Sequence, residues 1–302
     1  MISVIIPTHN RCELLTRAIK SVASQTIKED VEIIVVSDGS TDNTKKIVEG
    51  LGLQNLKFIE YFPSQNGNHA RNVGLSVSSG EYVAFLDDDD EWLPTKLEKQ
   101  IGFMRDAKCG MSFTLSKIIY INEKVSYVTK PTNLQDFSKL LLLKNCIGST
   151  STVIVEKKII EKSGLFDEKL PALQDYDMWI RICKYTQAVC VNESLVNYYN
   201  YTNKKNSNEQ VSSNVHRYEQ AFEVIESKYR ERFDELSSKE KKIRLKNKLI
   251  LLCNKCLRNG KRGAAIKYSF KMLKHGFFKD FLKFFVCSFI SYKRVLKLRS
   301  SD

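Results

Sequence analysis

Four consecutive aspartates, Asp87–Asp90, directly follow the apolar run Tyr82–Leu86. A buried strand gains nothing for its core by ending in carboxylates, but ligands of open α/β sheets bind beyond the carboxyl ends of strands. Mg²⁺ and Mn²⁺ take carboxylate oxygens together with the phosphate oxygens of a substrate. The cluster therefore predicts a site for a divalent cation and a diphosphate, and the plain alternative is a solvated acidic turn.

The elements that must position this cluster alternate between strands and helices. Apolar runs of strand length predict strands at Ser3–Pro7, Val31–Ser37, Leu56–Tyr61 and Tyr82–Leu86. Helical stripes and caps predict helices at Glu13–Ser24, Lys45–Leu51, His69–Val77 and Pro94–Asp106. Alternation of this kind indicates βαβ units and a mostly parallel sheet.

The remainder of the chain changes from mixed to helical. Further strands are expected at 109–121, 150–155 and within 188–201, and further helices at 137–143, 156–163 and 175–183. A stretch rich in Asn, Lys and Ser is typical of a linker and covers 202–213. Four helices are expected beyond it, at 214–236, 239–259, 261–275 and 277–298. We therefore expect an α/β domain at 1–205 and a basic helical region at 206–302.

The basic charge of the chain belongs to its C-terminal end. The 302 residues carry a formal net charge of +13. Residues 241–302 hold 18 Lys and Arg against Asp280 and Asp302, a balance of +16, which leaves −3 for residues 1–240. Such a segment should bind something anionic: lipid headgroups, a nucleic acid or a polyanion.

Composition and cysteine usage favour a cytoplasmic protein. No apolar run reaches transmembrane length, and Met1–Pro7 lacks the basic and small-residue features of a signal peptide. The eight cysteines are scattered, which fits reduced thiols better than a disulfide framework. Cys253 and Cys256 form a single CxxC pair, which we expect to occupy two helical positions one turn apart, with zinc or redox use as the alternative.

The last two expected helices combine aromatic, aliphatic and basic residues. Between Tyr268 and Arg294, Phe and Leu side chains are interleaved with lysines. This combination is typical of helices that lie in a membrane interface, where anionic lipids add about 1 kcal/mol for each nearby Lys or Arg. We expect contact with an anionic membrane surface, and the alternative is a helical hairpin packed on the main domain with its lysines outward.

Several segments of residues 2–200 resemble one known family. In chain order they are Val4–Arg11, Val35–Asp42, Asn66–Gly74, Asp87–Asp90 and the pair Gly164–Glu168 with Gln174–Arg181. Their order and spacing resemble the family 2 glycosyltransferases of bacterial polysaccharide assembly. The resemblance implies the GT-A fold of nucleotide-diphospho-sugar transferases: a mostly parallel sheet flanked by helices, here with a helical C-terminal extension.

The first two of these segments resemble the family's nucleotide-binding segments. Pro7 and Thr8 would end the first strand and frame the base and ribose. Asp38 would follow the second strand, where its carboxylate can accept the imide N–H of uracil or thymine. The same carboxylate would accept from guanine, so the base stays open, with UDP favoured. The structural alternative for Asp38 is a local bond within its own turn.

Two roles are open for Arg71, a phosphate or nucleotide contact and an ion pair with an aspartate of the cluster. Because strand residues alternate, Asp87 and Asp89 are expected to share a face. The resemblance implies that Asp89 binds Mn²⁺ or Mg²⁺ directly, while Asp87 and Asp88 contact ribose or metal-bound water. Asp90 remains the alternative second ligand.

The resemblance also implies a catalytic base. In the family the base precedes a Tyr-Asp-hydrophobic-Trp sequence, and Asp175 holds that position, although Gln174 stands where Glu is usual. A carboxylate there takes the proton of the acceptor hydroxyl as it attacks the anomeric carbon. The structural alternative for Asp175 is a helix N-cap. Asp177 and Trp179 are expected to be structural, with Arg181 paired to Asp177.

These features predict an inverting glycosyltransferase. It would move a sugar from a nucleotide-diphosphate donor, with UDP favoured, to a hydroxyl of a lipid-linked saccharide, on the inner face of the cell membrane. A sugar nucleotidyltransferase would need a glycine-rich loop where this chain has Thr8–Arg11. Two rival functions stay open: a catalytically degenerate nucleotide-binding protein, and a nucleic-acid-binding protein that uses the basic tail.

Overall fold

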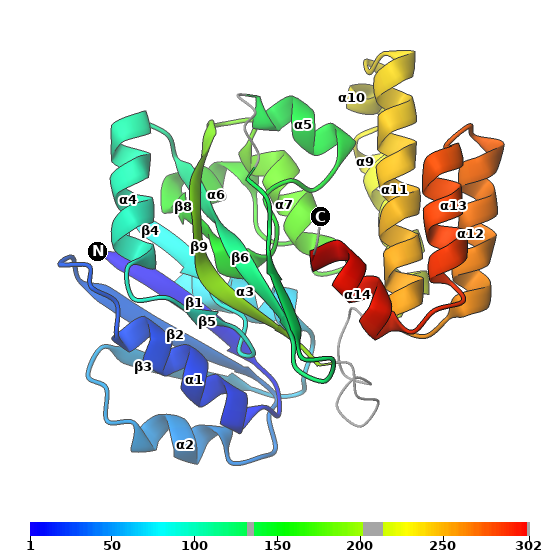
Figure 1. The fold of residues 1–302 in the computed structure, drawn as a ribbon. Helices are drawn as coiled ribbons and strands as arrows, with labels where there is room; N and C mark the ends of the chain where they lie inside the picture. Colours follow the sequence, from blue (N-terminus) through cyan, green and yellow to red (C-terminus); the bar gives the residue numbers. More distant parts are fainter. Residues whose placement is uncertain (132–135, 202–213, 301–302) are drawn as a thin grey trace.

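The structure is a computed structural model that describes residues 1–131, 136–201 and 214–300 (Figure 1). Its centre is a nine-stranded sheet with the order β3-β2-β1-β4-β8-β6-β9-β5, and β7 pairs with β6. The first four strands of this order are parallel: β3 (Leu56–Tyr61), β2 (Val31–Asp38), β1 (Ile2–Thr8) and β4 (Tyr82–Phe85). The carboxyl ends of β1, β2 and β4 therefore meet at one edge of the sheet.

The second part of the sheet is mixed. Strand β8 (Val153–Glu156) runs antiparallel to both β4 and β6 (Met111–Tyr120). Strand β6 is parallel to β9 (Ala188–Asn200). The short strands β5 (Glu91–Trp92) and β7 (Val125–Val128) add antiparallel pairs and were not expected from the sequence. The α/β fold of the GT-A type is confirmed, while the expectation of a mostly parallel sheet holds for the first four strands.

Helices cover both faces of the sheet, which is why β1 is buried along its whole length. Alternate side chains of β1 point to opposite faces. Val4 and Ile6 join a cluster with α1 (Cys12–Ala23) and α4 (Lys96–Ala107). Ile5 joins the opposite cluster. That second face carries α3 (Gly67–Val77), α5 (Phe137–Leu143), α6 (Lys157–Ser163) and α7 (Gln174–Ile182). The small helix α2 (Thr44–Gly50) lies beside α1.

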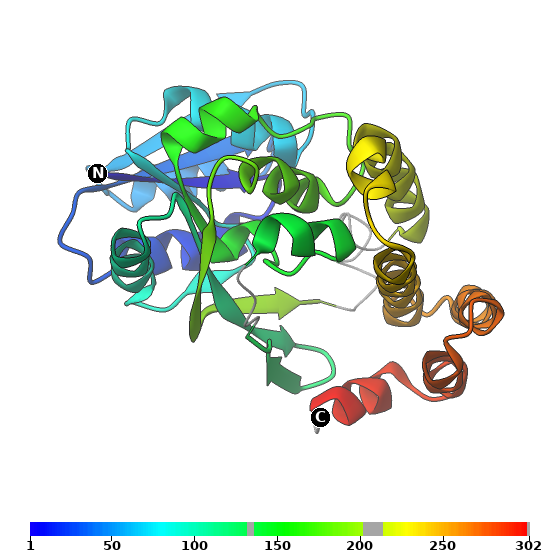
Figure 2. The ribbon, with the colours of Figure 1, turned by 90° about the horizontal axis from the view of Figure 1, so that it is seen from above.

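The C-terminal helices stand to one side of the sheet and form an arc in the view from above (Figure 2). They are α9 (Val215–Lys228), α10 (Arg230–Asp234), α11 (Ser238–Arg258), α12 (Arg262–Lys274), α13 (Phe278–Cys287) and α14 (Tyr292–Ser300). One apolar cluster runs from β4 and α7 into α9, α11 and α12. The helical region is therefore packed firmly onto the α/β core. The expected linker 202–213 lies outside the described residues.

Two of the expected C-terminal helices are each divided in two. The helix expected at 214–236 is interrupted at Tyr229, which has a φ of −116°. The helix expected at 277–298 is interrupted between α13 and α14. There the Ser288 hydroxyl donates to the Phe284 carbonyl (2.8 Å), and the Ser291 hydroxyl accepts the backbone N–H of Arg294 (3.4 Å). Serine side chains compete with the helical ladder in this way. The break lets α14 turn back to the sheet, where the Tyr292 hydroxyl donates to Tyr120 (3.3 Å).

Candidate active site

The four aspartates form a turn and not the end of a strand. Strand β4 ends at Phe85, and the Asp90 N–H donates to the Asp87 carbonyl (3.0 Å). The strand alternation that would place Asp87 and Asp89 on one face therefore does not apply, which corrects the expectation. Each aspartate instead meets its own partners.

Asp88 and Asp89 share one arginine. Arg11 Nη1 donates to Asp88 Oδ1 (3.0 Å) and to Asp89 Oδ2 (3.2 Å). The Thr8 hydroxyl donates to Asp88 Oδ2 (2.7 Å), and Thr8 and Asp88 are both buried. Thr8, which follows Pro7 at the end of β1, thus holds Asp88 in position. The sequence did not single out Arg11, although it closes the Val4–Arg11 segment.

Asp90 belongs to the interior. It is fully buried, and its two oxygens accept hydrogen bonds from the Ser151 hydroxyl (2.6 Å) and the Tyr199 N–H (3.3 Å). Burial is the main reason that its pKa lies well above the usual value. Asp90 therefore holds the turn against β9 and does not face the site.

Asp87 pairs with the arginine of α3. Arg71 Nη2 donates to Asp87 Oδ1 (2.6 Å), and the Thr150 hydroxyl donates to the same oxygen (3.1 Å). Of the two roles open for Arg71, the ion pair is present. Asn72 of α3 also accepts the Phe166 N–H (2.9 Å) and donates to Glu168 Oε1 (2.7 Å). Helix α3 therefore ties the 164–168 segment to the aspartate turn.

Asp38 ends β2 and binds the loop that follows β3. Its carboxylate accepts the Gln65 N–H (2.7 Å) and the Ser64 hydroxyl (3.1 Å). The next residue, Gly39, has a φ of +65°, and a Cβ there would lie 2.7 Å from the Ser64 nitrogen. Only glycine allows this approach. His9 Nδ1 donates to the Asp38 carbonyl (2.5 Å), which connects the ends of β1 and β2. The Asp38 carboxylate thus bonds to a loop distant in the sequence, and not within its own turn as the structural alternative supposed.

Asp175 lies in the first turn of α7 and is not its N-cap. The N-cap is Leu173, a left-handed residue with a φ of +60° and no side-chain capping bond. Such backbone is strained for a leucine, and buried packing holds it in place. Asp175 Oδ1 accepts its neighbour Tyr176 N–H (2.7 Å), and Asn145 Nδ2 lies 3.4 Å from Oδ2. Its carboxylate forms no ion pair with any described residue.

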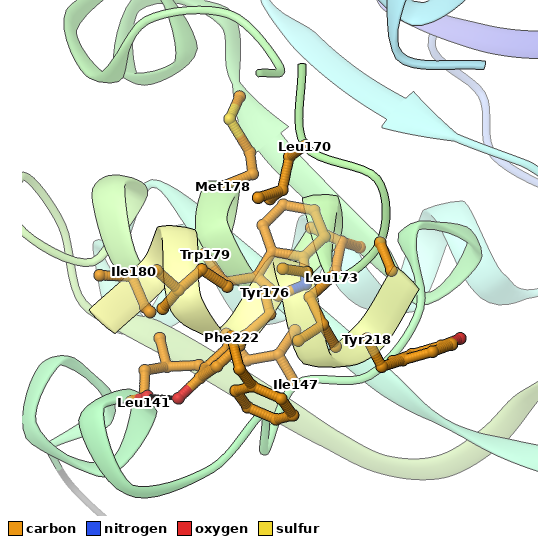
Figure 3. Packing of buried hydrophobic residues seen from close by; sticks show 14 of the residues in the cluster. Leu141, Ile147, Leu170, Leu173, Tyr176, Met178, Trp179, Ile180, Tyr218 and Phe222 are labelled. Carbon is orange, nitrogen blue, oxygen red and sulfur yellow. Dashed lines mark hydrogen bonds between the residues drawn. The ribbon is translucent and has the colours of Figure 1, made fainter. Parts of the chain in front are cut away.

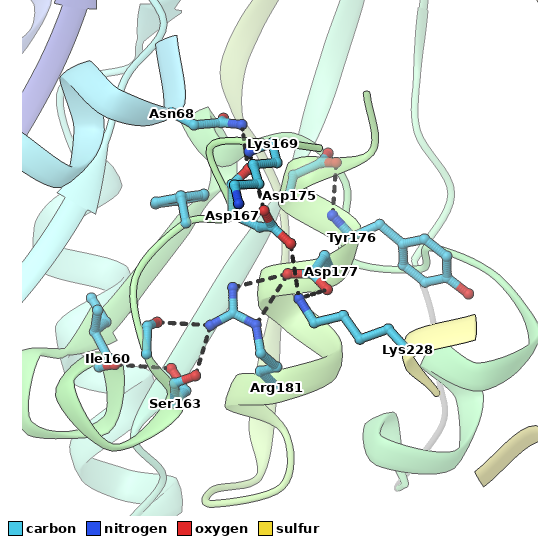
Figure 4. A network of polar contacts seen from close by, with 12 residues as sticks. Asn68, Ile160, Ser163, Asp167, Lys169, Asp175, Tyr176, Asp177, Arg181 and Lys228 are labelled. Carbon is cyan, nitrogen blue, oxygen red and sulfur yellow. Dashed lines mark hydrogen bonds and ion pairs between the residues drawn. The ribbon is translucent and has the colours of Figure 1, made fainter. Parts of the chain in front are cut away.

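Asp177, two residues further on, is surrounded by partners (Figure 4). Its Oδ2 accepts two bonds from Arg181 (3.1 and 3.0 Å), as the i,i+4 spacing predicted. Its Oδ1 accepts the Tyr229 hydroxyl (2.6 Å) and lies 2.8 Å from Lys228 Nζ. The Asp177 side chain is fully buried, and these contacts join α7 to α9.

The opposite face of α7 is fixed by packing (Figure 3). Trp179 is fully buried, and its indole N–H donates to the Gly148 carbonyl (3.1 Å). The Tyr176 hydroxyl donates to the Leu141 carbonyl (2.5 Å). The expectation that Trp179 lies in the core is confirmed. These contacts hold the helix that presents Asp175.

The carboxylates of the site carry more negative charge than the fold neutralises. Burial is the largest cause that raises the pKa of Asp175, to about 6, and Asp87 adds to it while Arg71 opposes it. Burial and then Asp88 raise the pKa of Asp89 to about 7. Asp87 and Arg71 act on Asp175 electrostatically, so the aspartate turn and α7 border one site.

The donor set of the aspartate turn fits a hard divalent cation. It consists of carboxylate oxygens with an excess of negative charge, which Mg²⁺ or Mn²⁺ would relieve. Within residues 1–131, 136–201 and 214–300, no group of three or more His, Cys, Asp or Glu side chains surrounds one point. A cation here would therefore complete its shell with water and the phosphates of a substrate, as Mg²⁺ commonly does.

The two cysteines of the CxxC pair, Cys253 and Cys256, are buried in α11 and free. They occupy positions one turn apart in one helix, as expected. None of the helices in the described parts of the chain has the length and apolar character needed to cross a membrane.

Comparison with known proteins agrees with the geometry. WfgD of Escherichia coli, a UDP-Glc:alpha-D-GlcNAc-diphosphoundecaprenol beta-1,3-glucosyltransferase, is 31% identical over 192 residues, which cover 64% of this chain and 73% of WfgD. An uncharacterized glycosyltransferase of Rickettsia felis is 34% identical over 193 residues, which cover 61% of this chain and 31% of the relative. This chain thus spans about a third of that relative's length.

The fold has solved counterparts. The structure of S. aureus TarS 1–349 matches with a TM-score of 0.54 and 18% identity, over 94% of this chain and 90% of that chain. At this identity the match shows the shared fold. The sequence model described as Glycosyl transferase family 2 matches residues 3–160, more than half of the chain. The chain therefore belongs to glycosyl transferase family 2.

Proposed function

We propose that this chain is an inverting, metal-dependent glycosyltransferase that moves a sugar from a UDP-sugar to a hydroxyl of a lipid-linked saccharide. The observation that carries the proposal is Asp175. It is a half-buried carboxylate without an ion-pair partner among the described residues, and its pKa is raised to about 6 beside Asp87 and Arg71. A base with a pKa near the working pH is suited to proton transfer.

The reaction is a single displacement in which Asp175 takes the proton. The acceptor oxygen forms a bond to the anomeric carbon while the bond to the donor diphosphate breaks, and the diphosphate leaves with the electron pair. Asp175 accepts the hydroxyl proton during the attack. Mn²⁺ or Mg²⁺ held by Asp89 would neutralise the charge that builds on the leaving diphosphate. Arg71 and Arg11 fix the turn that carries Asp89.

The relatives and the Asp38 region support the proposed donor and acceptor. WfgD and WfaP of Escherichia coli, both 31% identical to this chain, are named as enzymes that use UDP-Glc and a diphosphoundecaprenol-linked GlcNAc. Pro7, Thr8 and Asp38 end two neighbouring strands at the same edge of the sheet. This edge supports a nucleotide site, because α/β folds bind ligands beyond the carboxyl ends of strands.

A thermal-shift panel tests the donor and the metal. The purified chain is heated with UDP, GDP, TDP or CMP, each with Mn²⁺, Mg²⁺ or EDTA. A ligand that binds only the folded state raises the melting temperature, by about 2.7 kcal/mol of stability at a hundredfold excess over Kd. We expect the largest shift with UDP and a divalent cation. An unchanged melting temperature under every condition would count against a nucleotide site and favour a nucleic-acid-binding protein.

We also propose that α12, α13 and α14 lie on an anionic membrane surface at the inner face of the cell membrane. Five apolar side chains on α12 and α13 and in the turn that follows are each more than a third exposed: Phe270, Phe278, Leu282, Val286 and Phe289. Exposed lysines accompany them at Lys271, Lys274, Lys279 and Lys283. A hollow of about 340 Å³ between α13 and α14 is lined almost entirely by apolar atoms. Apolar and basic groups on one surface suit a lipid interface.

Point substitutions test this surface better than deletion, because Met272 and Phe284 of the same helices are buried in the core. Phe278→Asp combined with Phe289→Asp should reduce sedimentation with phosphatidylglycerol vesicles at least tenfold. Phe103→Asp, a matched change at an exposed phenylalanine of α4, should leave it unchanged. Binding that survives the double substitution would refute the membrane assignment.

A further inference from the structure

Two lysines on one face of α11 differ in what surrounds them. Lys248 Nζ lies 5.2 Å from the Phe222 ring and 3.0 Å from Glu226 Oε1, both on α9. Lys255 lies two turns further along, and its Nζ lies 4.4 Å from the ring of Tyr218, again on α9. Lys255 forms no ion pair with any described carboxylate. Packing against α9 is thus common to both lysines, and the missing acid distinguishes Lys255.

Lys255 is half-buried, and its ammonium group packs against α9. Tyr218 is buried and belongs to the same apolar cluster as Leu173 and Tyr176 of the α7 region (Figure 3). The carboxylate of Asp175 acts electrostatically on both Lys255 and Tyr218. Helix α11 therefore brings a half-buried ammonium group to the side of the site that Asp175 borders.

A second cation lies one turn away. Arg258 follows Lys255 on α11 and acts electrostatically on Lys255 and Tyr218. It also acts electrostatically on Tyr198 of β9. The carboxylates of Asp90, Asp89 and Asp87 in the aspartate turn act on the same tyrosine. Arg258 is thus within electrostatic range of side chains on both α9 and β9.

We propose that Lys255 binds the phosphate or diphosphate group of the acceptor, while the acceptor hydroxyl lies at Asp175. The proposal deepens the proposed function by assigning the anionic part of the acceptor site. In a pyranose linked through its anomeric oxygen to a diphosphate, the hydroxyls at C3 and C4 lie across the ring from the diphosphate. A cation site near the base, but distinct from the aspartate turn, fits that geometry.

The energetics of Lys255 favour an anionic occupant. Burial is the largest cause that lowers its pKa, to about 7, and Arg258 lowers it further, while Asp175 opposes both. A bound phosphate would stabilise the ammonium form and supply the acceptor oxygens that Lys255 lacks. Lys248 needs no such ligand, because Glu226 already supplies them.

Trace acetylation of the full chain tests the site independently of turnover. Acetic anhydride is added at pH 7 in the presence of excess UDP, which keeps the competitor out of the donor site. Modification of Lys255 and Lys248 is then quantified by mass spectrometry with and without inorganic diphosphate. We expect diphosphate to slow acetylation of Lys255 at least fivefold and to leave Lys248 unchanged. Equal rates at Lys255 with and without diphosphate would overturn the proposal.

Steady-state kinetics distinguish the loss of acceptor-diphosphate binding from a general disturbance of the active site. The probes are GlcNAc linked through an α-diphosphate to a short alkyl chain and the alkyl glycoside of the same sugar. Lys255→Met should raise KM for the diphosphate acceptor about tenfold and leave KM for the donor unchanged. Lys255→Arg should restore most of the affinity, and Lys248→Met should behave as wild type.

The outcomes are distinguishable. If Lys255→Met slows transfer to both acceptors equally, Lys255 supports Asp175 and not the phosphate, and the proposal fails. If neither acceptor is used by the wild type, the acceptor class of the proposed function fails. The acetylation result then still decides whether Lys255 binds the free diphosphate anion.

Discussion

Asp175 and Asp177 occupy opposite faces of the first turn of α7, and the fold treats them in opposite ways. Asp177 is fully buried and accepts hydrogen bonds from Arg181 and Tyr229. Burial opposes its ionisation, but Arg181, Lys228 and Tyr229 outweigh burial and hold its pKa below the usual value. Asp175 forms no ion pair with a described residue, and its pKa is raised, mainly by burial. One carboxylate stabilises the fold, and the other is kept available for chemistry.

The two lysines of α11 repeat this contrast with the opposite sign of charge. Lys248 pairs with Glu226, whereas Lys255 near Asp175 has no acid partner among the described residues. A buried charge without a partner destabilises a fold. Its presence at the border of a site therefore indicates a ligand or a reaction that uses it.

The largest expected effect is on catalysis by Asp175. Asp175→Asn keeps the size of the side chain but removes the base, so transfer should fall by about 10³-fold. UDP affinity, measured by calorimetry, should stay within twofold of the wild type. If the variant retains more than a tenth of the wild-type transfer rate, Asp175 is not the catalytic base.

Asp177→Asn should act on stability instead. The change leaves Arg181 and Lys228 without their buried carboxylate, which should cost about 3 kcal/mol in the free energy of unfolding. Urea denaturation followed by circular dichroism measures this loss. Per folded molecule the transfer rate should remain close to that of the wild type. A loss below about 1 kcal/mol would show that the Asp177 network is not a major support of α7.

Asp175→Asn should have the opposite effect on stability. The pKa of Asp175 is about 6 in the folded protein against an ordinary value of 3.8. The folded state thus disfavours the ionised form, and stability falls as pH rises toward 6. The variant should be more stable than the wild type by about 1–3 kcal/mol above pH 6, and no more stable below pH 3.8. Equal melting temperatures across this range would contradict the electrostatic contrast.

The smallest effect is the pH dependence of the wild-type rate. Asp175 must be ionised to accept a proton, so kcat/KM should fall about tenfold per pH unit below a pKa of about 6. Initial rates in a constant-ionic-strength buffer series measure this limb. An acidic limb displaced to about pH 4 would indicate that Asp175 is as solvated as an ordinary aspartate.

The sequence predicted the elements better than the contacts between them. Periodicity placed the first four strands, and the i,i+4 spacing predicted the pair of Asp177 with Arg181. No local pattern could predict that Lys228 and Tyr229 complete this network, because they lie 51 and 52 residues after Asp177 in the chain. Where partners come from distant segments, sequence spacing carries no signal.

The aspartate turn shows the same limit. A run of four identical residues does not reveal where the strand ends. The prediction that strand alternation places Asp87 and Asp89 on one face was therefore wrong, because β4 ends at Phe85. Arg11 could have been found, because a cation in a quoted site segment is a natural partner for these carboxylates. Lys255 could not, since nothing in α11 itself distinguishes it from Lys248.

The most direct test of the contrast on α7 is a carboxyl ¹³C NMR titration of the native protein. The resonances of Asp175 and Asp177 are assigned by the signal that each Asn variant lacks. We expect a titration midpoint of about pH 6 for Asp175 and one below pH 3.8 for Asp177. Two carboxyls that titrate together near the ordinary aspartate value would contradict it.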